Sequence, residues 1–131
     1  MSIREGLWTY LSTHPGITSV VSDRIYLVRF PQEVVFPAIT YAKISGIPYM
    51  QLHQRGDLDR SRYQFDCWGE DELQAINVAA ALRDALEGFK GTMGSEIVHA
   101  VIPIEVGTDD FDEVTAAGFR VISEYEIWHV V

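Results

Sequence analysis

Residues 60–88 read RSRYQFDCWGEDELQAINVAAALRDALEG, and this segment predicts a β-strand that leads directly into an α-helix. Polar and apolar side chains alternate over Arg60–Trp68, a period of two that is typical of an antiparallel strand with one buried face. Gly69 separates this strand from the helix. The strand face that we expect to be buried carries Ser61, Tyr63, Phe65 and Cys67.

The helix is expected from about Glu70 to Glu87. Three acidic residues begin it, where negative charge favours the positive end of the helix dipole. Gly88 follows at the position of a left-handed C-terminal cap. Apolar residues at steps of three and four predict one buried stripe, made of Leu73, Ile76, Ala79, Ala80, Leu82 and Leu86. The strand and the helix together predict the core against which the other segments pack.

The rest of the chain predicts one further helix and several strands. That helix is expected over Ser2–Ser12, where Ser2 and Glu5 have the spacing of a capping box. Pro15 and Gly16 are expected to end the helical segment. Further strands are expected over Ile25–Phe30, Ala38–Ser45, Glu96–Val106 and Gly118–Val130, with Pro103 indicating a sheet edge or a bulge.

Three connections complete the predicted fold. Gly46–Asp59 is a long link between two antiparallel strands, Gly91–Ser95 is a turn, and Gly107–Ala117 is an acidic loop. We therefore expect an α+β fold for a single domain of residues 1–131. It consists of a mainly antiparallel β-sheet with two helices packed on one face, and it carries a long β-hairpin loop.

The composition indicates an ordinary globular protein. The chain has 131 residues, of which 47% are hydrophobic and 22% charged. Its one cysteine, Cys67, excludes an intrachain disulfide. No apolar run approaches the about 18 to 20 residues of a membrane-spanning helix, and the charges at Arg4 and Glu5 do not fit a signal peptide. We therefore expect a soluble protein that is made in the cytoplasm and has no membrane partner.

The net charge of −9 is unevenly distributed along the chain. Residues 1–62 carry seven Lys/Arg and five Asp/Glu, a net +2, whereas residues 63–131 carry three and fourteen, a net −11. Direct nucleic-acid binding is disfavoured, because it requires clustered cations to neutralise phosphates. Two interpretations remain open: an acidic surface that aids solubility, or a surface that faces another acidic polymer without binding it.

The reactive residue types do not form a recognisable site. Cys67 is expected on the inward strand face as a small buried hydrophobe, and His99 and His129 lie on predicted strands. The acidic run at 109–113 lacks the loop glycine and the distal glutamate of an EF-hand. The residues therefore predict no catalytic, cofactor-binding or metal site. A small enzyme that uses Cys67, His99 and carboxylates is the competing class.

The connection Gly46–Asp59 is unusual for a merely solvated loop, because long loops in compact domains tend to have functions of their own. Tyr49, Met50 and Leu52 give it an apolar content. These side chains either form a small satellite core beneath the loop or present a surface to a partner.

The order and spacing of several motifs resemble the tail-completion, or tail-terminator, proteins of long-tailed phages and of prophage-like gene transfer agents. The resemblance covers nearly the whole chain and is most specific at 62–69, RYQFDCWG, and in the alanine-rich helix that follows. The sequence of this chain departs from the family pattern in the acidic segment 107–113. The other matching segments are Leu11-Ser12, 23–26 (DRIY), Pro31-Gln32, 37–41 (PAITY), 44–46 (ISG), 85–89 (ALEGF), and the closing strand from Arg120-Val121 to Ile127-Trp128.

The resemblance implies a structural virion protein without enzymatic activity or cofactor. Such a protein forms a ring, commonly a hexamer, on the head-proximal end of the tail tube. The ring ends tube polymerisation and provides the surface on which the head docks. The implied partners are further copies of the chain, the tail-tube protein, and a head-tail connector or head-closure protein, while DNA passes through the lumen without specific binding. Another neck component, a head-closure or adaptor protein, is the alternative.

Two sets of residues are hypotheses for sites in such an assembly. The first is an interface on the long loop, made of Tyr49, Met50, Gln51, Leu52, His53 and Arg55. The second is an acidic lining of the lumen, made of Asp109, Asp110, Asp112 and Glu113. The polar strand face with Arg62, Gln64 and Asp66 is further expected to meet a neighbouring subunit.

Overall fold

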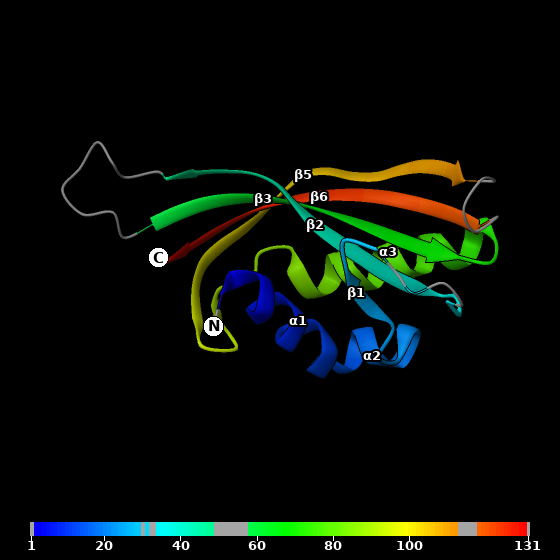
Figure 1. Ribbon diagram of the computed structural model, residues 1–131, viewed down its shortest axis with the longest axis horizontal. Coiled ribbons are helices and arrows are strands. Elements are labelled where there is room, and N and C mark those ends of the chain that lie inside the picture. The colour runs from blue at the N-terminus through cyan, green and yellow to red at the C-terminus, as the bar shows by residue number, and fades with distance from the viewer. Residues whose placement is uncertain (1, 30, 32–33, 49–57, 113–117, 131) are drawn as a thin grey trace.

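The computed structural model describes residues 2–29, 31, 34–48, 58–112 and 118–130 (Figure 1). Helices cover one face of a curled sheet, and the sheet extends beyond them at the end where the β2–β3 pair lies. The α+β class predicted from the sequence is confirmed. The elements in chain order are α1 Ile3–Thr13, α2 Pro15–Val21, β1 Ile25–Leu27, β2 Ala38–Pro48, β3 Leu58–Gly69, α3 Glu72–Leu86, β4 Gly91–Met93, β5 Glu96–Asp112 and β6 Gly118–Val130.

The six described strands form one sheet in the order β1-β2-β3-β6-β5-β4. Most neighbours are antiparallel, as predicted, but β1 runs parallel to β2, with Ile25 opposite Ile39. The sheet is therefore mixed. Parallel neighbours cannot be joined by a hairpin, and residues 28–37 separate β1 from β2 in the sequence.

Three helices, not the predicted two, are present among the described residues. The first has the predicted capping box, in which Ser2 N donates to Glu5 Oε1 at 2.8 Å and Glu5 N donates to Ser2 Oγ at 3.3 Å. The additional helix is α2. Pro15 is its first residue. Proline is favourable there because the N–H that it lacks has no partner within the helix at that position. The His14 ring accepts a hydrogen bond from Gly16 N and caps α2.

The packing face of α3 differs from the predicted stripe. Leu73 and Ile76 are 67% and 41% exposed, and Ala80 is exposed as well. The short link from β3 to α3 explains this difference. A Cβ at Gly69 would lie 2.5 Å from Ala75 N, so the first turns of α3 lie close to the end of β3 and present small residues to the sheet. Asp71 caps the helix, which therefore begins at Glu72. The buried face consists of Ala75, Val78, Ala79, Leu82, Ala85 and Leu86.

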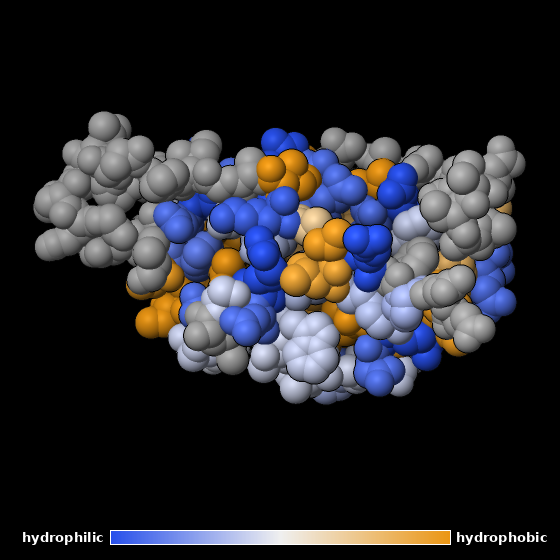
Figure 2. All heavy atoms as spheres, viewed as in Figure 1, coloured by the Kyte–Doolittle hydropathy of each residue, from blue (hydrophilic) through white to orange (hydrophobic). Residues whose placement is uncertain are grey.

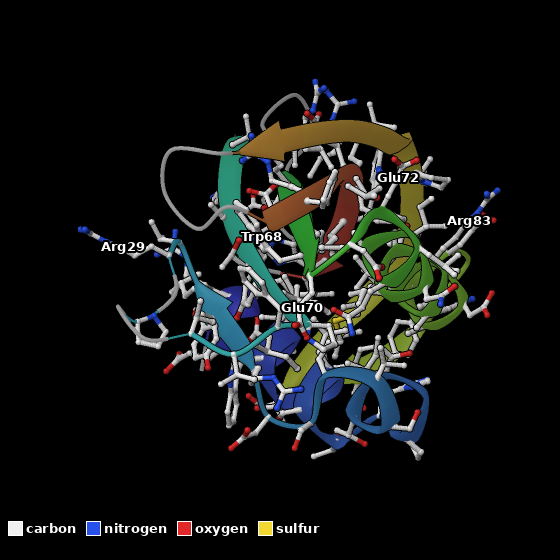
Figure 3. The ribbon with its side chains drawn as sticks, turned by 90° about the vertical axis from the view of Figure 1, so that its right-hand side faces the viewer. Arg29, Trp68, Glu70, Glu72 and Arg83 are labelled. Carbon is white, nitrogen blue, oxygen red and sulfur yellow. The ribbon has the colours of Figure 1, made fainter. Side chains whose placement is uncertain are left out.

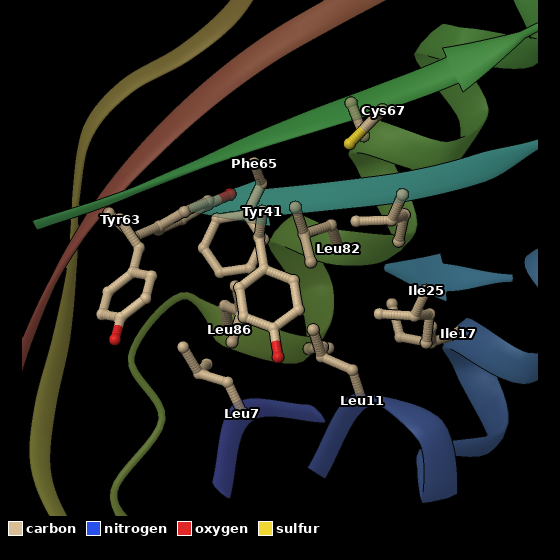
Figure 4. Packing of buried hydrophobic residues seen from close by; sticks show 14 of the residues in the cluster. Leu7, Leu11, Ile17, Ile25, Tyr41, Tyr63, Phe65, Cys67, Leu82 and Leu86 are labelled. Atoms are coloured by element: carbon tan, nitrogen blue, oxygen red, sulfur yellow. The ribbon is translucent and has the colours of Figure 1, made fainter. Parts of the chain in front are cut away.

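Aromatic rings from three central strands form the middle of the core (Figure 4). Phe65 of β3 lies 5.6 Å from the Tyr41 ring of β2 and 5.8 Å from the Tyr125 ring of β6, measured between centroids. Leucines of α1 and α3 close over these rings. The predicted inward face of β3 is confirmed, since Ser61, Tyr63, Phe65 and Cys67 are all buried.

Two strand pairs are longer than predicted and form ribbons. Pairing of β2 with β3 reaches Pro48 opposite Asp59. The connection predicted for 46–59 is therefore shorter and covers only residues 49–57. Pairing of β5 with β6 reaches Asp112 opposite Gly118, and the acidic loop predicted for 107–117 is wrong over 107–112. Acidic residues disfavour strands, but cross-strand neighbours outweigh that preference here.

Smaller features of the fourth and fifth strands follow from local sequence. The predicted turn Gly91–Ser95 contains the short strand β4, which pairs with the start of β5. The bulge predicted at Pro103 is confirmed, because the β5–β6 register shifts between Pro103 and Glu105. Gly88 has φ of +76° after α3, as predicted for a left-handed position.

Replacing Trp68 by alanine tests the outer face of β3. The indole is only 4% exposed, and its Nε1 donates to Thr40 Oγ1 at 3.2 Å. Its ring stacks on Phe36 at 5.9 Å. We expect Trp68→Ala to lower the free energy of unfolding by about 3 kcal/mol, because a buried aromatic leaves a cavity. Thermal unfolding measures this; Trp8→Ala, at a half-exposed site, is the control, and equal melting temperatures for both variants would contradict the assignment.

Two tyrosines form a matched pair for the core. Tyr125 is fully buried, and its hydroxyl has no hydrogen-bond partner among the described residues. The Tyr41 hydroxyl donates to Arg4 O at 2.8 Å. Urea unfolding of Tyr125→Phe is expected to show unchanged or slightly higher stability, whereas Tyr41→Phe loses about 1 kcal/mol with its hydrogen bond. A larger loss for Tyr125→Phe would show that its hydroxyl is satisfied.

Candidate assembly surfaces

The predicted loop interface lies outside the described residues. Tyr49, Met50, Gln51, Leu52, His53 and Arg55 all belong to 49–57, between the paired ends of β2 and β3. Their role as a contact surface stays a prediction.

The predicted acidic lining falls mostly on a strand and not on a loop. Asp109, Asp110 and Asp112 occupy backbone positions of β5 opposite Val121, Arg120 and Gly118 of β6, and Glu113 lies outside the described residues. The end of the β5–β6 ribbon thus brings the first three residues together along one strand. Whether they line a lumen stays a prediction.

The sheet face opposite the helices carries a ladder of ion pairs between β3 and β6. Arg62 Nε donates to Glu124 Oε1 at 2.8 Å, and Arg60 Nε lies 3.3 Å from Glu126 Oε2. Further along, Arg120 pairs with Asp66 at 3.2 Å, and Gln64 Nε2 donates to Asp66 Oδ1 at 2.9 Å. We call these side chains the charge ladder: Arg60, Arg62, Gln64, Asp66, Arg120, Glu124 and Glu126.

Two tryptophans lie at the ends of the charge ladder. The Trp128 Nε1 donates to Glu126 at 2.9 Å while Arg60 lies over its ring at 5.6 Å. At the other end Arg120 lies over Trp68 at 5.3 Å. In Figure 3 Trp68 lies within the curl of the sheet, whereas Arg29 and Arg83 point away from the body on opposite sides.

The charge ladder explains what the polar face does within one subunit. Partly exposed ion pairs each contribute little to stability, but a diagonal series across two strands favours a single register. Sequence reasoning identified Arg62, Gln64 and Asp66 but missed the partners on β6, which are Glu124 for Arg62 and Arg120 for Asp66. The alternation of Arg120, Glu124 and Glu126 along the closing strand was the available signal.

A second surface, missed from the sequence, is an apolar pocket of about 480 Å³ between α1 and β1. Trp8 is 47% exposed there, and its Nε1 donates to Ile25 O at 3.3 Å. Figure 2 shows apolar atoms exposed near the middle of this face. We call this feature the α1–β1 pocket; it is lined by Arg4, Glu5, Trp8, Ile25, Tyr26, Leu27, Arg29 and Tyr41.

The structure separates the residues of the competing enzyme hypothesis. Cys67 is fully buried, and burial raises the pKa of its thiol, so a thiolate nucleophile is disfavoured. Cys67 lies opposite Val121 of β6, whereas exposed His99 follows Val98, which lies opposite His129 of β6. Val121 and His129 are eight residues apart on this strand, a distance of about 26 Å. Burial lowers the pKa of His129, whose Nε2 lies 3.0 Å from Ser61 Oγ.

Within the part of the chain that the structure describes, no group of three or more His, Cys, Asp or Glu side chains is arranged to hold a metal ion. No helix there is long and apolar enough to cross a membrane.

The comparisons with known proteins agree with the fold. A chain from a solved structure described as "Virion of native gene transfer agent (GTA) particle" superposes with a TM-score of 0.77 at 12% identity, over 99% of this chain and 96% of that one. No curated protein matches the sequence. Residues 5–129 match the family described as Tail completion protein gp17. The chain therefore belongs to the tail completion protein gp17 family and is a structural protein of a phage-type tail.

Proposed function

We propose that this chain caps the head-proximal end of the tail tube as a ring of identical subunits. The ring ends tube polymerisation and forms the surface that joins tail to head. The observation that carries this proposal is the family match over residues 5–129, which spans α2, α3, most of α1 and nearly all of the sheet. We further propose that residues 1–131 act as one domain in the ring.

The two ribbons support a ring. The far ends of the β2–β3 and β5–β6 pairs lie toward opposite ends of the long axis, and the β2–β3 end lies beyond the helices (Figure 1). A subunit with contact elements at both ends is suited to touch a different surface on each neighbour, as closed rings require. In the sequence, residues 49–53 and Arg55 lie between Pro48, which ends β2, and Leu58, which begins β3.

The charge distribution supports the same arrangement. A net +2 in residues 1–62 and −11 in residues 63–131 supply complementary surfaces, which favour correct register during association. The acidic residues 109, 110, 112 and 113 are proposed to face the lumen, where repulsion keeps the passing DNA from adhering. The proposed partners are the tail-tube protein and a head-tail connector or head-closure protein. Assembly into the virion follows synthesis in the bacterial cytoplasm.

Electron microscopy of particles made without this chain tests the function. Without a cap, subunits of the tube continue to add, and the joining surface is absent. We therefore expect tails that are longer than normal and carry no heads. Tails of normal length that lack heads would overturn the capping role and favour another neck component, a head-closure or adaptor protein.

A triple substitution tests the loop interface. Tyr49→Ser, Met50→Ser and Leu52→Ser together remove the apolar content of the loop. We expect an unchanged melting temperature but a loss of head-to-tail joining of roughly tenfold or more, because apolar anchors dominate interface energies. Leu73→Ser with Ile76→Ser, on the exposed side of α3, is the control. Normal joining by the loop variant would sink the interface hypothesis.

A further inference from the structure

The α1–β1 pocket has apolar walls that hydrogen bonds within the subunit hold in place. Trp8 and Leu27, which are 47% and 41% exposed, line it together with buried Tyr41. Trp8 Nε1 donates to Ile25 O at 3.3 Å, and the Tyr41 hydroxyl donates to Arg4 O at 2.8 Å. Because the polar ends of both aromatic side chains are bonded, their rings are already ordered before any partner binds. Such ordering lowers the entropy cost of binding.

Cations gather at the pocket, although the chain as a whole has a net charge of −9. Arg4 and Arg29 line it and are exposed. Neither forms an ion pair with a carboxylate of the described residues. Arg4 is held by a hydrogen bond with the Tyr63 side chain, which does not neutralise its charge. Exposed Lys43 follows two positions after Tyr41 on β2 and therefore lies on the same face.

The carboxylate of Glu5, which also lines the pocket, is engaged elsewhere. It accepts hydrogen bonds from Ser2 N at 2.8 Å and from Ser2 Oγ at 3.1 Å. These bonds lower the pKa of Glu5, so that it stays ionised as part of the helix cap. The pocket thus combines ordered apolar walls with cations that are open to an outside anion. This combination suits an apolar group that is joined to carboxylates.

The edge of the sheet beside the pocket is closed to a further strand. Strand β1 pairs with β2 on one side only. Its remaining backbone groups are used within the subunit: Ile25 N donates to Asp23 O at 2.9 Å, and Ile25 O accepts from Trp8. Leu27 O accepts from Arg29 N at 2.8 Å. Because strand addition would need these groups, a partner is recognised here through its side chains.

The position of the pocket favours a partner other than a neighbour in the ring. Figure 1 places α1 and β1 near the middle of the long axis, away from the far ends of the β2–β3 and β5–β6 pairs. Those far ends are the proposed contacts between neighbouring subunits. Figure 2 shows the same broad face, with apolar atoms exposed near its middle. A surface in this position recurs once per subunit and stays open to a different protein.

We propose that the α1–β1 pocket binds a segment of another virion protein in which an aromatic side chain is flanked by aspartate or glutamate. The aromatic ring packs against Trp8 and Leu27, and the carboxylates pair with Arg4 and Arg29. Aromatic side chains in pockets supply much of the affinity of protein interfaces, and charge pairs at the rim add specificity. This inference rests on the proposed function, because it takes the partner from the proteins that the ring meets.

A nucleic acid also offers rings and negative charges, but it fits the pocket less well. Nucleic-acid grooves follow the phosphate backbone with a track of cations. The cations at this pocket, Arg4, Arg29 and Lys43, are too few for such a track on a chain with a net charge of −9.

Titration with a synthetic peptide tests the recognition. The probe is the acetylated and amidated peptide Asp-Glu-Phe-Asp-Glu, and binding is followed by NMR through the indole N–H signal of Trp8. We expect a saturable shift of this signal. Binding is expected to weaken roughly tenfold or more when serine replaces phenylalanine in the peptide, and equally when the chain carries Arg29→Glu. Lys90→Glu, an exposed charge outside the pocket, is the matched control and is expected to bind as the unaltered chain does.

Several results of this titration would overturn the proposal. One is an unchanged Trp8 signal, and another is equal affinity for the two peptides or for Arg29→Glu and its control. Tighter binding of hexathymidylate at the same salt concentration would assign the pocket to nucleic acid. A Trp8 shift that depends on protein concentration without peptide would assign it to a second copy of this chain.

Photocrosslinking in assembled particles identifies the occupant. The crosslinking residue p-benzoylphenylalanine replaces Leu27 at the pocket or, as the control, Leu73, which is 67% exposed on α3. Position 27 is expected to crosslink to another virion protein, at a segment in which mass spectrometry finds an aromatic residue beside carboxylates. A crosslink between two copies of this chain, a segment of different composition, or a yield no higher than the control would contradict the assignment.

The pocket assignment and the capping function fail separately. If position 27 gives the expected crosslink but tails made without the chain keep their normal length, the capping function fails and the pocket assignment stands. If those tails are overlong and the crosslink is absent, the capping function stands and the pocket assignment fails.

Discussion

The close approach of Gly69 to the first turn of α3 is the constraint on which the rest of the structure depends. A methyl group at this position would lie 2.5 Å from Ala75 N, so β3 and α3 are joined with no space for a larger residue. This link fixes which side of α3 faces the sheet and places Leu82 and Leu86 over Phe65 (Figure 4). The aromatic layer of β2, β3 and β6 and the leucines of α1 then complete the same core.

Because the helices occupy one face of the sheet, the other face is left for polar groups. The charge ladder satisfies them within the subunit, by pairing Arg60, Arg62 and Asp66 with residues of β6. The strand pairs continue to Pro48 and Asp112, across register shifts in both the β2–β3 and the β5–β6 pair. The long strand pairs and the uncovered α1–β1 pocket are the surfaces that the proposed assembly can use.

Elements with short-range signals could be predicted from the sequence. The alternation of buried and exposed residues in β3 and in β6 depends on residues close together in the chain, and so does the capping box of α1. The structure contains each of these three features. The short helix α2 could not be predicted with the same rules, since a proline that ends one helix also opens the next. Strand β5 continues through acidic residues because β6 lies beside it, a tertiary effect that the sequence near Asp110 does not contain.

Surfaces were harder to predict than elements, because they join residues that are distant in the sequence. The charge ladder pairs positions separated by up to 66 residues, from Arg60 to Glu126. The α1–β1 pocket depends on the packing of Trp8 against Ile25 O, whereas the amphipathic pattern of α1 alone places Trp8 in the core. Electron cryo-microscopy of an assembled tail tests the central claim most directly. A closed ring of this chain on the head-proximal end of the tube is the predicted result, and density for the chain elsewhere in the particle, or in an open array, would contradict it.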